Sequence, residues 1–294
     1  MTKISGIFAA TMSVLNPDLS LNVEKTIDHA EKLIDQGCHG TAIFGSTGQS
    51  QLIAISEKID LLNKLSRSKH KDKHLIGTGL NSLGETINFI KIATSLNFKK
   101  FLIMPPAYYK YGDFEVLEFY TKLIESVPEC KIIIYNFEKL CGYKFSIDCV
   151  KELVKRFPNQ IVGVKDSSYN LFENLKLKNF SIFPGSELKL LKGLQLGCSG
   201  IITATCNVTA EMSRKVYDDF FSGKEQSCNQ KLCDVRSVFD KFNLISGLHT
   251  FYSQEDKIYK NILPPLSLLN KSEEKKLINA LKNLKFTNKS PLAA

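Results

Sequence analysis

The chain has 294 residues, of which 43% are hydrophobic and 23% are charged, and its formal net charge is +9 with a pI near 9.0. This composition is typical of a globular protein with a substantial core and excludes a largely disordered chain. The basic residues are spread along the whole sequence, without a dense Arg/Lys block interleaved with aromatic residues, so we expect no nucleic acid as a partner.

Eight short apolar runs, rich in β-branched residues, predict β-strands in the first two thirds of the chain. They lie within residues 4–12, 39–45, 73–80, 98–105, 131–136, 160–166, 180–186 and 199–205. Most are continuous apolar runs rather than alternating ones, which is expected of strands that are covered on both faces.

Segments with helical periodicity separate the apolar runs. Residues 22–37 place Ile27 and Ala30 on one apolar stripe, which predicts an amphipathic helix. Residues 56–68 show the same spacing, and Ser56 is their expected N-cap.

The strand and helix patterns alternate eight times, which is typical of one α/β architecture, the (β/α)₈ or TIM barrel. We therefore predict a barrel with the catalytic site over residues 1–222. Only helical patterns remain after that, so residues 223–294 are expected to form a C-terminal helical extension packed on the barrel. Chemistry in such barrels lies at the carboxyl ends of the strands, so the polar residues after each apolar run are the candidates.

Lys165 stands directly after apolar residues in "IVGVKDSS". Burial disfavours the charged ammonium and leaves a nucleophilic amine near neutral pH, which attacks ketones to form a Schiff base. The alternative is a structural lysine that pairs with Asp166 or extends to the barrel mouth, and its position alone leaves both interpretations open.

Two further strand ends carry groups suited to the same chemistry. Tyr135 ends the run "KIIIY", where a phenol can transfer protons, although a core tyrosine with a satisfied hydroxyl fits the same pattern. The turn "GSTGQS" contains Gly45, Ser46 and Thr47, and its backbone N–H groups are suited to hold a carboxylate. Any tight turn has a similar composition, so this motif alone is weak.

Four motifs together carry a resemblance to a known family. In order and spacing, "GSTGQS", "PPAYY", "YNFEKLCG" and "GVKDSS" resemble the N-acetylneuraminate lyase and dihydrodipicolinate synthase family of pyruvate-dependent class I aldolases. The similarity runs from about Ile4 to the C-terminal helices. It implies a TIM barrel with a three-helix extension, a homotetramer built as a dimer of dimers, and pyruvate and an aldehyde as substrates, with no cofactor.

The resemblance also implies roles for individual residues. Lys165 matches the Schiff-base lysine and Tyr135 the proton-transferring phenol. Ser46 and Thr47 match paired hydroxyl residues whose side chains relay protons and whose backbone amides hold the pyruvate carboxylate. Tyr108 matches a tyrosine that in relatives reaches across the dimer interface to complete the hydroxyl chain.

Several positions depart from the family pattern at the substrate end of the pocket. Leu140 occupies the place of an arginine that binds the second substrate's carboxylate in the synthases, so this chain is more similar to the lyase and sugar-acid aldolase branches. Sialic-acid lyases have an acidic pair after the strand-seven glycine, whereas Gly185 here is followed by Glu187 alone. Gln49 stands where relatives often have Glu. We expect Leu140, Gly185, Glu187 and Thr203 to bind substrate.

These features predict a Schiff-base lyase or aldolase that cleaves or forms a C–C bond between pyruvate and an aldehyde, with a 2-keto-3-deoxy sugar acid or related compound as substrate. Two alternatives stay open. One is a 4-hydroxy-tetrahydrodipicolinate (dihydrodipicolinate) synthase that condenses pyruvate with aspartate semialdehyde in lysine biosynthesis, and the other is a barrel that binds a keto acid without turnover.

The cysteines and the apolar runs indicate the cellular compartment of the protein. The eight cysteines form no CxxC pair and have no histidine in zinc-finger spacing, so we expect reduced thiols and no metal site. No apolar run reaches the roughly 18–20 residues of a membrane span, and the first residues lack a secretory signal pattern. A cytoplasmic protein without a membrane partner is therefore expected.

Overall fold

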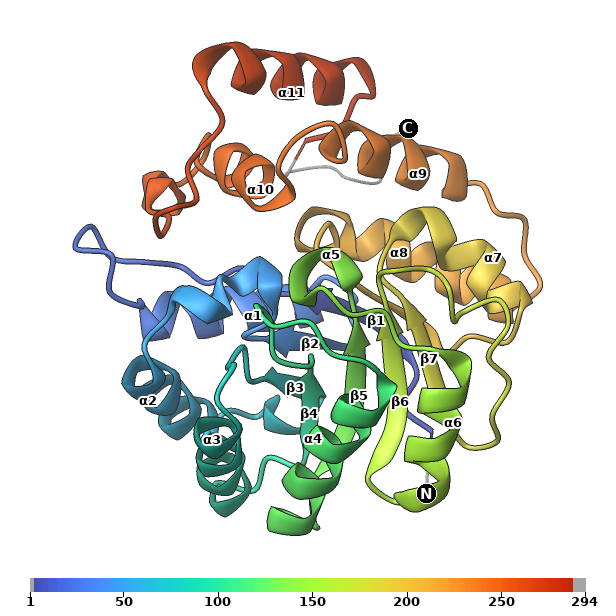
Figure 1. Cartoon of the computed structure of the whole chain (residues 1–294). Coiled ribbons are helices and arrows are strands. Elements are labelled where there is room, and N and C mark those ends of the chain that lie inside the picture. The colour runs from blue at the N-terminus through green and yellow to red at the C-terminus, as the bar shows by residue number, and fades with distance from the viewer. Residues whose placement is uncertain (1–2, 288–294) are drawn as a thin grey trace.

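All eight predicted strands form, and they pair in parallel around a barrel (Figure 1). The computed structural model describes residues 3–287. The strands are β1 (Gly6–Ala10), β2 (Gly40–Ile43), β3 (His74–Gly77), β4 (Lys100–Ile103), β5 (Lys131–Asn136), β6 (Ile161–Asp166), β7 (Ser181–Pro184) and β8 (Gly200–Thr203). Their order is β7-β6-β5-β4-β3-β2-β1-β8, and Ser199 N donates to Ile182 O at 2.8 Å between the two ends. The predicted fold class, a TIM barrel, is confirmed.

Helices cover the outside of the barrel, except for the short α5 (Glu138–Cys141), which lies over the carboxyl ends of the strands (Figure 1). The others are α1 (Val23–Asp35), α2 (Ile55–Leu65), α3 (Leu83–Ser95), α4 (Asp113–Ser126), α6 (Ile147–Arg156), α7 (Leu190–Gln195) and α8 (Cys206–Phe221), with 3-10 turns η1 (Ser46–Gly48), η2 (Ser50–Leu52), η3 (Lys71–Lys73) and η4 (Glu187–Lys189). In α1 the predicted stripe, Ile27 and Ala30, is buried, and the Asn22 side chain caps the helix by accepting from Lys25 N.

Two local expectations differ from the structure. The helix α2 begins at Ile55, so Ala54 rather than Ser56 is its N-cap. The backbone N–H of Ala54 donates to Glu57 Oε2 at 3.2 Å. The strand–helix alternation is interrupted after β6, where residues 167–180 form a loop without a helix. The carboxylate of Asp166 accepts backbone N–H groups of this loop, so side-chain bonds replace a helical ladder there.

The strand side chains divide between two apolar layers. Residues that point into the barrel form a small inner core of Phe8, Ala10, Ala42, Leu75, Leu102, Ile133, Tyr135, Phe183 and Ile202. Residues of the same strands that point outward, such as Ile43, Ile134 and Val164, pack in the larger layer beneath the helices. This two-sided burial explains why the strands read as continuous apolar runs.

A register irregularity in β6 decides which of its side chains point inward. Ile132 pairs with Ile161, but the next residue of β5, Ile133, pairs with Gly163, so β6 contains one extra residue. Strict alternation from Ile161, which packs in the outer layer, would place Lys165 on that same outer side. The extra residue reverses the phase, so Lys165 points into the barrel.

Three further helices form the C-terminal extension: α9 (Asn229–Phe239), α10 (Leu244–Tyr252) and α11 (Lys271–Asn283). The 3-10 turn η5 (Lys257–Lys260) lies between α10 and α11 in the chain. The three helices lie over the end of the barrel toward which the strands point (Figure 1). The helix α10 has no amphipathic pattern of its own, because its residues from Ser246 to Tyr252 are all buried and leave no polar face. Part of the predicted extension, residues 288–294, lies outside the described residues.

Two expectations from the sequence concern membrane-spanning helices and cysteines. Within residues 3–287, no helix is both long and apolar enough to cross a membrane. All eight cysteines are free thiols in the structure.

Candidate active site

Lys165 and Tyr135 lie side by side near the carboxyl ends of β6 and β5. They are in register with each other, and residues in register on neighbouring parallel strands point to the same face of the sheet. Lys165 is only 3% exposed, and its Nζ lies 4.1 Å from the centre of the Tyr135 ring. The barrel thus places a nearly buried amine directly against a phenol.

Asp166 is not the partner of this amine. It follows Lys165 on the strand and points to the opposite face, where its carboxylate accepts from the backbone N–H groups of Leu171 and Phe172 at 2.9 Å and from Asn136 Nδ2 at 2.8 Å. Burial raises the pKa of the Asp166 carboxyl, while these donors favour its charged form. The interpretation of Lys165 as a salt-bridge partner of Asp166 therefore does not describe this structure.

The hydroxyl turn after β2 reaches the same place. The Oγ of Ser46 and the hydroxyl of Tyr135 are 3.2 Å apart, and Thr47 follows on η1. Gly48 is required for the close approach of this turn to β1, because a Cβ there would lie 2.9 Å from Thr11 O. Three strand ends that are far apart in the sequence thus bring together one amine and three hydroxyl groups.

These side chains line a pocket of about 690 Å³ at the carboxyl ends of the strands. The other lining residues are Phe137, Glu138, Lys139, Leu140, Ser167, Ser168, Tyr169, Gly185, Ala204, Arg236, Asp240, Phe242, Asn243, Leu244 and Ile245. Leu140 and Gly185 were expected from the sequence. The wall formed by α9 and the start of α10 was not, because no local pattern indicates which side of a C-terminal helix faces the barrel.

Four predicted residues are not part of this lining. Gly45 only begins the turn. Tyr108 is 89% exposed and lies outside the pocket of its own chain, with a φ of 90°. Glu187 and Thr203, which we expected to bind substrate, are buried and bind each other, with Thr203 Oγ1 donating to Glu187 Oε2 at 2.9 Å.

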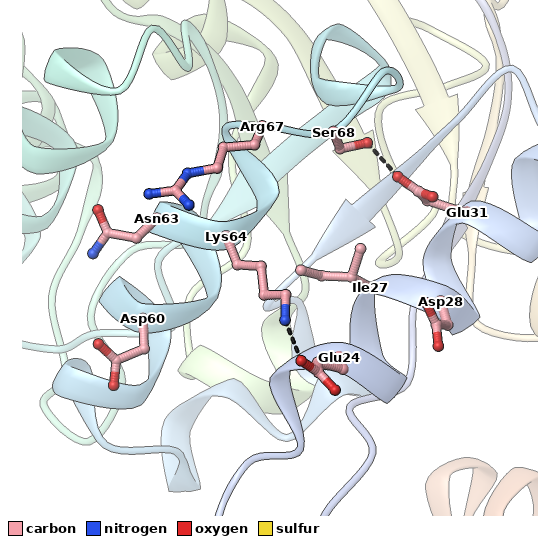
Figure 2. A pocket seen from close by; sticks show the side chains of 9 residues that line it. All are labelled: Glu24, Ile27, Asp28, Glu31, Asp60, Asn63, Lys64, Arg67 and Ser68. Atoms are coloured by element: carbon pink, nitrogen blue, oxygen red, sulfur yellow. Dashed lines mark hydrogen bonds and ion pairs between the residues drawn. The ribbon is translucent and has the colours of Figure 1, made fainter.

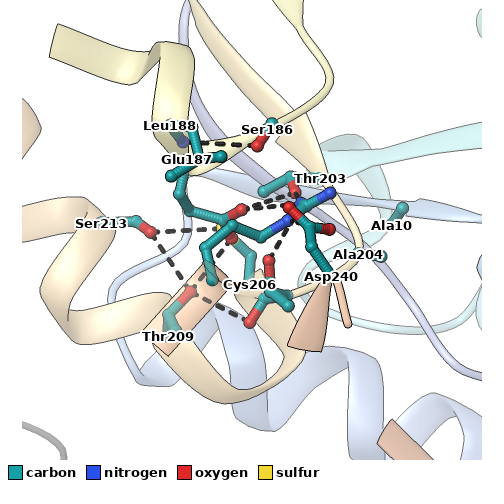
Figure 3. A network of polar contacts seen from close by, with 12 residues as sticks. Ala10, Ser186, Glu187, Leu188, Thr203, Ala204, Cys206, Thr209, Ser213 and Asp240 are labelled. Atoms are coloured by element: carbon teal, nitrogen blue, oxygen red, sulfur yellow. Dashed lines mark hydrogen bonds and ion pairs between the residues drawn. The ribbon is translucent and has the colours of Figure 1, made fainter. Parts of the chain in front are cut away.

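The Glu187 carboxylate is held inside a polar network (Figure 3). Arg236 Nη1 donates to Glu187 Oε2 at 3.0 Å and to Thr203 Oγ1 at 2.9 Å, and Thr209 Oγ1 donates to Glu187 Oε1 at 3.1 Å. The Nε of Arg236 donates to Asp240 Oδ1 at 2.8 Å. Glu187 is therefore a partner of an arginine on the pocket wall rather than a residue of the wall itself.

A second hollow, of about 680 Å³, lies between α1 and α2 on the outside of the barrel (Figure 2). Two pairs of its polar side chains bind each other: Lys64 pairs with Glu24, and Ser68 donates to Glu31. It lacks the cluster of amine and hydroxyl groups found at the strand ends. The candidate active site is therefore the pocket around Lys165.

Comparison with known proteins identifies the family. The sequence pattern of the Dihydrodipicolinate synthetase family matches residues 3–284. A DapA-like lyase of Chloroflexus aurantiacus, itself uncharacterised, is 26% identical over 83% of this chain and 84% of its own length. An N-acetylneuraminate lyase of Actinobacillus pleuropneumoniae is 28% identical over 76% of this chain and 78% of its own length.

Solved structures agree on the fold. YagE from E. coli K12, a protein of the dihydrodipicolinic acid synthase family solved in complex with pyruvate, has a TM-score of 0.87 at 22% identity and covers 97% of this chain and 100% of its own. The chain belongs to the Dihydrodipicolinate synthetase family, whose members are class I pyruvate-dependent lyases and aldolases. The expected family and enzyme class are confirmed.

Proposed function

Since the chain is a member of this family, we propose that it is a Schiff-base lyase or aldolase that cleaves or forms a C–C bond between pyruvate and an aldehyde, with Lys165 as the imine-forming residue. One observation carries this proposal. The Lys165 amine is almost buried in a pocket, 4.1 Å from the ring of Tyr135, and the nearest carboxylate in sequence, Asp166, is bound elsewhere. An amine in such a place is available for attack on a carbonyl.

The proposed chemistry begins at the keto carbon of pyruvate. Lys165 Nζ attacks C2 to form a carbinolamine, and loss of the C2 oxygen as water gives the imine. Tyr135 supplies the proton for this departure, and Ser46 Oγ, 3.2 Å from its hydroxyl, passes protons to and from the phenol. In the synthetic direction, the protonated imine loses a C3 proton to the Tyr135–Ser46 hydroxyl pair, and C3 of the resulting enamine attacks the aldehyde carbonyl. In the cleavage direction, Lys165 forms the same imine with the longer 2-keto acid, the C4 hydroxyl gives its proton to this pair, and the C3–C4 bond breaks to leave the enamine and the aldehyde.

The turn that carries Ser46 and Thr47 is proposed to bind the pyruvate carboxylate. Both residues line the pocket beside Lys165, and successive backbone N–H groups in a tight turn form a concavity suited to anions. A carboxylate held there fixes C2 at the amine, which lowers the entropic part of the barrier.

The far end of the pocket supports a hydroxylated aldehyde. Leu140 lines the pocket and offers no charge, and the guanidinium of Arg236 is already compensated by the carboxylates of Glu187 and Asp240. The other cation of this wall, Lys139, is exposed and offers a point charge rather than the planar two-donor fork with which an arginine binds a carboxylate. The amide of Asn243 and the carboxylate of Asp240 instead match the donors and acceptors of sugar hydroxyls. A 2-keto-3-deoxy sugar acid is therefore the favoured substrate class.

A homotetramer, built as a dimer of dimers, is proposed as the active assembly. Tyr108 and Tyr109 pack edge to face and are 89% and 75% exposed, and Phe114, five residues further along the chain, is 76% exposed. A patch of large exposed aromatic side chains is typical of a surface that another subunit covers. Tyr108 of a neighbouring subunit is proposed to complete the hydroxyl chain.

Incubation with pyruvate and borohydride tests the proposed function. Reduction of the imine should leave a stable adduct on Lys165, identified by peptide mass analysis, and Lys165→Ala should abolish both adduct and turnover. Lys58 is an internal control, because it is also fully buried but donates to Thr78 O at 2.9 Å outside the pocket. Absence of label on Lys165, while a known class I aldolase is labelled alongside, refutes the proposal.

The substrate is tested separately with the purified chain. Release of pyruvate is measured from a panel of 2-keto-3-deoxy sugar acids and sialic acid, and consumption of pyruvate is measured with aspartate semialdehyde. Turnover of the sugar acids at the highest kcat/KM is expected. Preference for aspartate semialdehyde would instead establish the synthase alternative.

A further inference from the structure

Gln49 stands at the end of the hydroxyl turn but does not line the pocket. It is 2% exposed, its φ is 56°, and its backbone N–H donates to Ser46 O at 3.0 Å. A left-handed conformation is uncommon for a residue with a side chain and persists only where the surroundings hold it. Contacts from other parts of the chain must therefore hold Gln49 in this conformation.

Both polar atoms of the Gln49 side chain bind the C-terminal extension. Its Oε1 accepts from Leu263 N at 2.8 Å, and its Nε2 lies 3.2 Å from Nε2 of His249 on α10. The C-terminal extension therefore contacts the hydroxyl turn through the buried side-chain amide of Gln49. Residues 200 and 214 positions further along the chain meet Gln49 at this point.

The partners fix the protonation state of His249. Its Nδ1 lies 2.9 Å from Tyr259 O, and since a carbonyl oxygen only accepts, Nδ1 carries the hydrogen. The Nε2 then has a free lone pair, to which the Gln49 amide donates. Burial lowers the pKa of His249 to about 4, so the ring is neutral near pH 7.

The same segment of the extension also contacts the barrel ends. The Tyr259 hydroxyl is 2.8 Å from His29 Nδ1, and His29 Nε2 is 2.8 Å from Asn207 Oδ1. Asn207 Nδ2 donates to Ala10 O at 2.7 Å and to Ala204 O at 2.6 Å, which joins the ends of β1 and β8. Tyr259 thus links both histidines, one through its carbonyl and one through its hydroxyl.

The titratable and charged groups packed around this network come from several elements. They are Asp28, His29 and Lys32 of α1, Cys38 shortly after it, Tyr252 of α10, Glu255 and Asp256 in the turn that follows, and Tyr259 of η5. Among these groups and His249 itself, it is His249 whose side chain is hydrogen-bonded to the side chain of Gln49.

We propose that Gln49 is a positioning residue for the proposed imine chemistry: through its two side-chain hydrogen bonds, the C-terminal extension holds the Ser46–Thr47 turn against Tyr135 and Lys165. The amide is suited to this task because it presents one donor to the lone pair of His249 and one acceptor to Leu263 N–H. A carboxylate offers two acceptors and no donor.

Gln49→Glu tests this directly, because Glu keeps the bond to Leu263 N but faces the His249 lone pair with a second acceptor. The introduced carboxylate raises the pKa of His249 in this variant, because an adjacent opposite charge favours the charged ring, and the turn is held only while the pair shares a proton. The rate of borohydride trapping of the pyruvate imine on Lys165, divided by that of the parent chain, should therefore fall roughly tenfold or more as pH rises from 6 to 8.5. Adding His249→Gln removes the titrating ring, so the ratio should then become independent of pH.

Gln51→Glu is the matched control, since Gln51 lies in the same segment and is exposed. Its trapping rate should follow that of the parent at every pH. If Gln49→Glu also follows the parent while circular dichroism shows it folded, the positioning role is refuted. If the parent itself is not labelled on Lys165, the proposed function fails instead, and hydrogen exchange then decides the positioning role: exchange of residues 45–52 should be faster in Gln49→Glu than in Gln51→Glu at pH 8.

If Gln49→Glu does not fold, hydrogen exchange of the parent chain supplies the measurement. Lowering the pH from 7 to 4 should speed exchange, corrected for the intrinsic rate, in residues 45–52 and 257–263 together. The Nε2–H of protonated His249 faces the amide NH₂ of Gln49, and the amide cannot turn its oxygen toward the ring without losing the bond from Leu263 N. Faster exchange in one of these segments without the other refutes the linkage.

Discussion

Gly163→Ala is expected to disturb the active site without touching any reactive group. Gly163 carries the register irregularity of β6, two residues before Lys165. A Cβ at this position would lie 2.6 Å from Ser181 O and 3.0 Å from Ser181 Cβ on β7. The nearer contact falls about 0.8 Å short of an ordinary van der Waals separation, and the obstacle is backbone that cannot rotate away.

The cost follows from this overlap. Relieving it requires β6 and β7 to separate or the irregularity to move, and overpacking of this kind costs about 2 kcal/mol of unfolding free energy. A shift of β6 also moves the Lys165 amine relative to the Tyr135 hydroxyl, and a displacement near 1 Å reduces turnover by roughly 100-fold. The expected result is thus a modest loss of stability with a large loss of kcat.

The assay combines urea denaturation with the rate of imine trapping on Lys165. Gly84→Ala is the matched control, because Gly84 lies exposed in α3 and a Cβ there meets only Ser82 Oγ at 3.9 Å. That variant should be unchanged or more stable by up to about 1 kcal/mol, since alanine has the higher helix propensity. A Gly163→Ala chain with the parent's stability and trapping rate would show that the irregularity does not place Lys165.

Two other predictions concern stability. Burial lowers the pKa of His29, His74 and His249 to about 4 in the folded chain. Below pH 6.5 the unfolded chain binds protons at these histidines before the folded chain does, so each histidine lowers the unfolding free energy by about 3 kcal/mol between pH 6.5 and pH 4. Urea midpoints should therefore fall steadily from pH 7 to pH 4, and constant midpoints contradict this. Glu187→Ala should cost about 3–5 kcal/mol because it leaves a buried guanidinium without its main partner, whereas Glu173→Ala, which breaks an exposed pair, should cost under about 1 kcal/mol; equal losses would refute the assignment.

Sequence patterns predicted the barrel and the four groups that the structure brings together at the carboxyl ends of its strands, because these depend on short segments. A strand that is covered on both faces must be apolar along its length, and the polar residue that follows it is then conspicuous. Lys165, Tyr135 and the Ser46–Thr47 turn are each recognisable in this way. The resemblance to a family added their roles, and the family itself is confirmed.

The substrate end of the pocket could not be predicted in the same manner. Glu187 follows a strand and fits the pattern of a substrate ligand, but its carboxylate binds Arg236, 49 residues further along the chain. A buried charge needs a partner, and the sequence alone does not say which residue supplies it. The wall made by Arg236, Asp240 and Asn243 is likewise set by how α9 and α10 dock on the barrel.

The sequence by itself determined that Lys165 ends an apolar strand, since local composition is sufficient for that. Which way its side chain points was decided only by the tertiary structure. One extra residue in β6 reverses the alternation of its side chains, and that irregularity exists because β5 and β7 pair with β6 in a fixed register. The same applies to Gln49, whose partner His249 lies 200 residues away and is reached only when the extension folds back over the barrel.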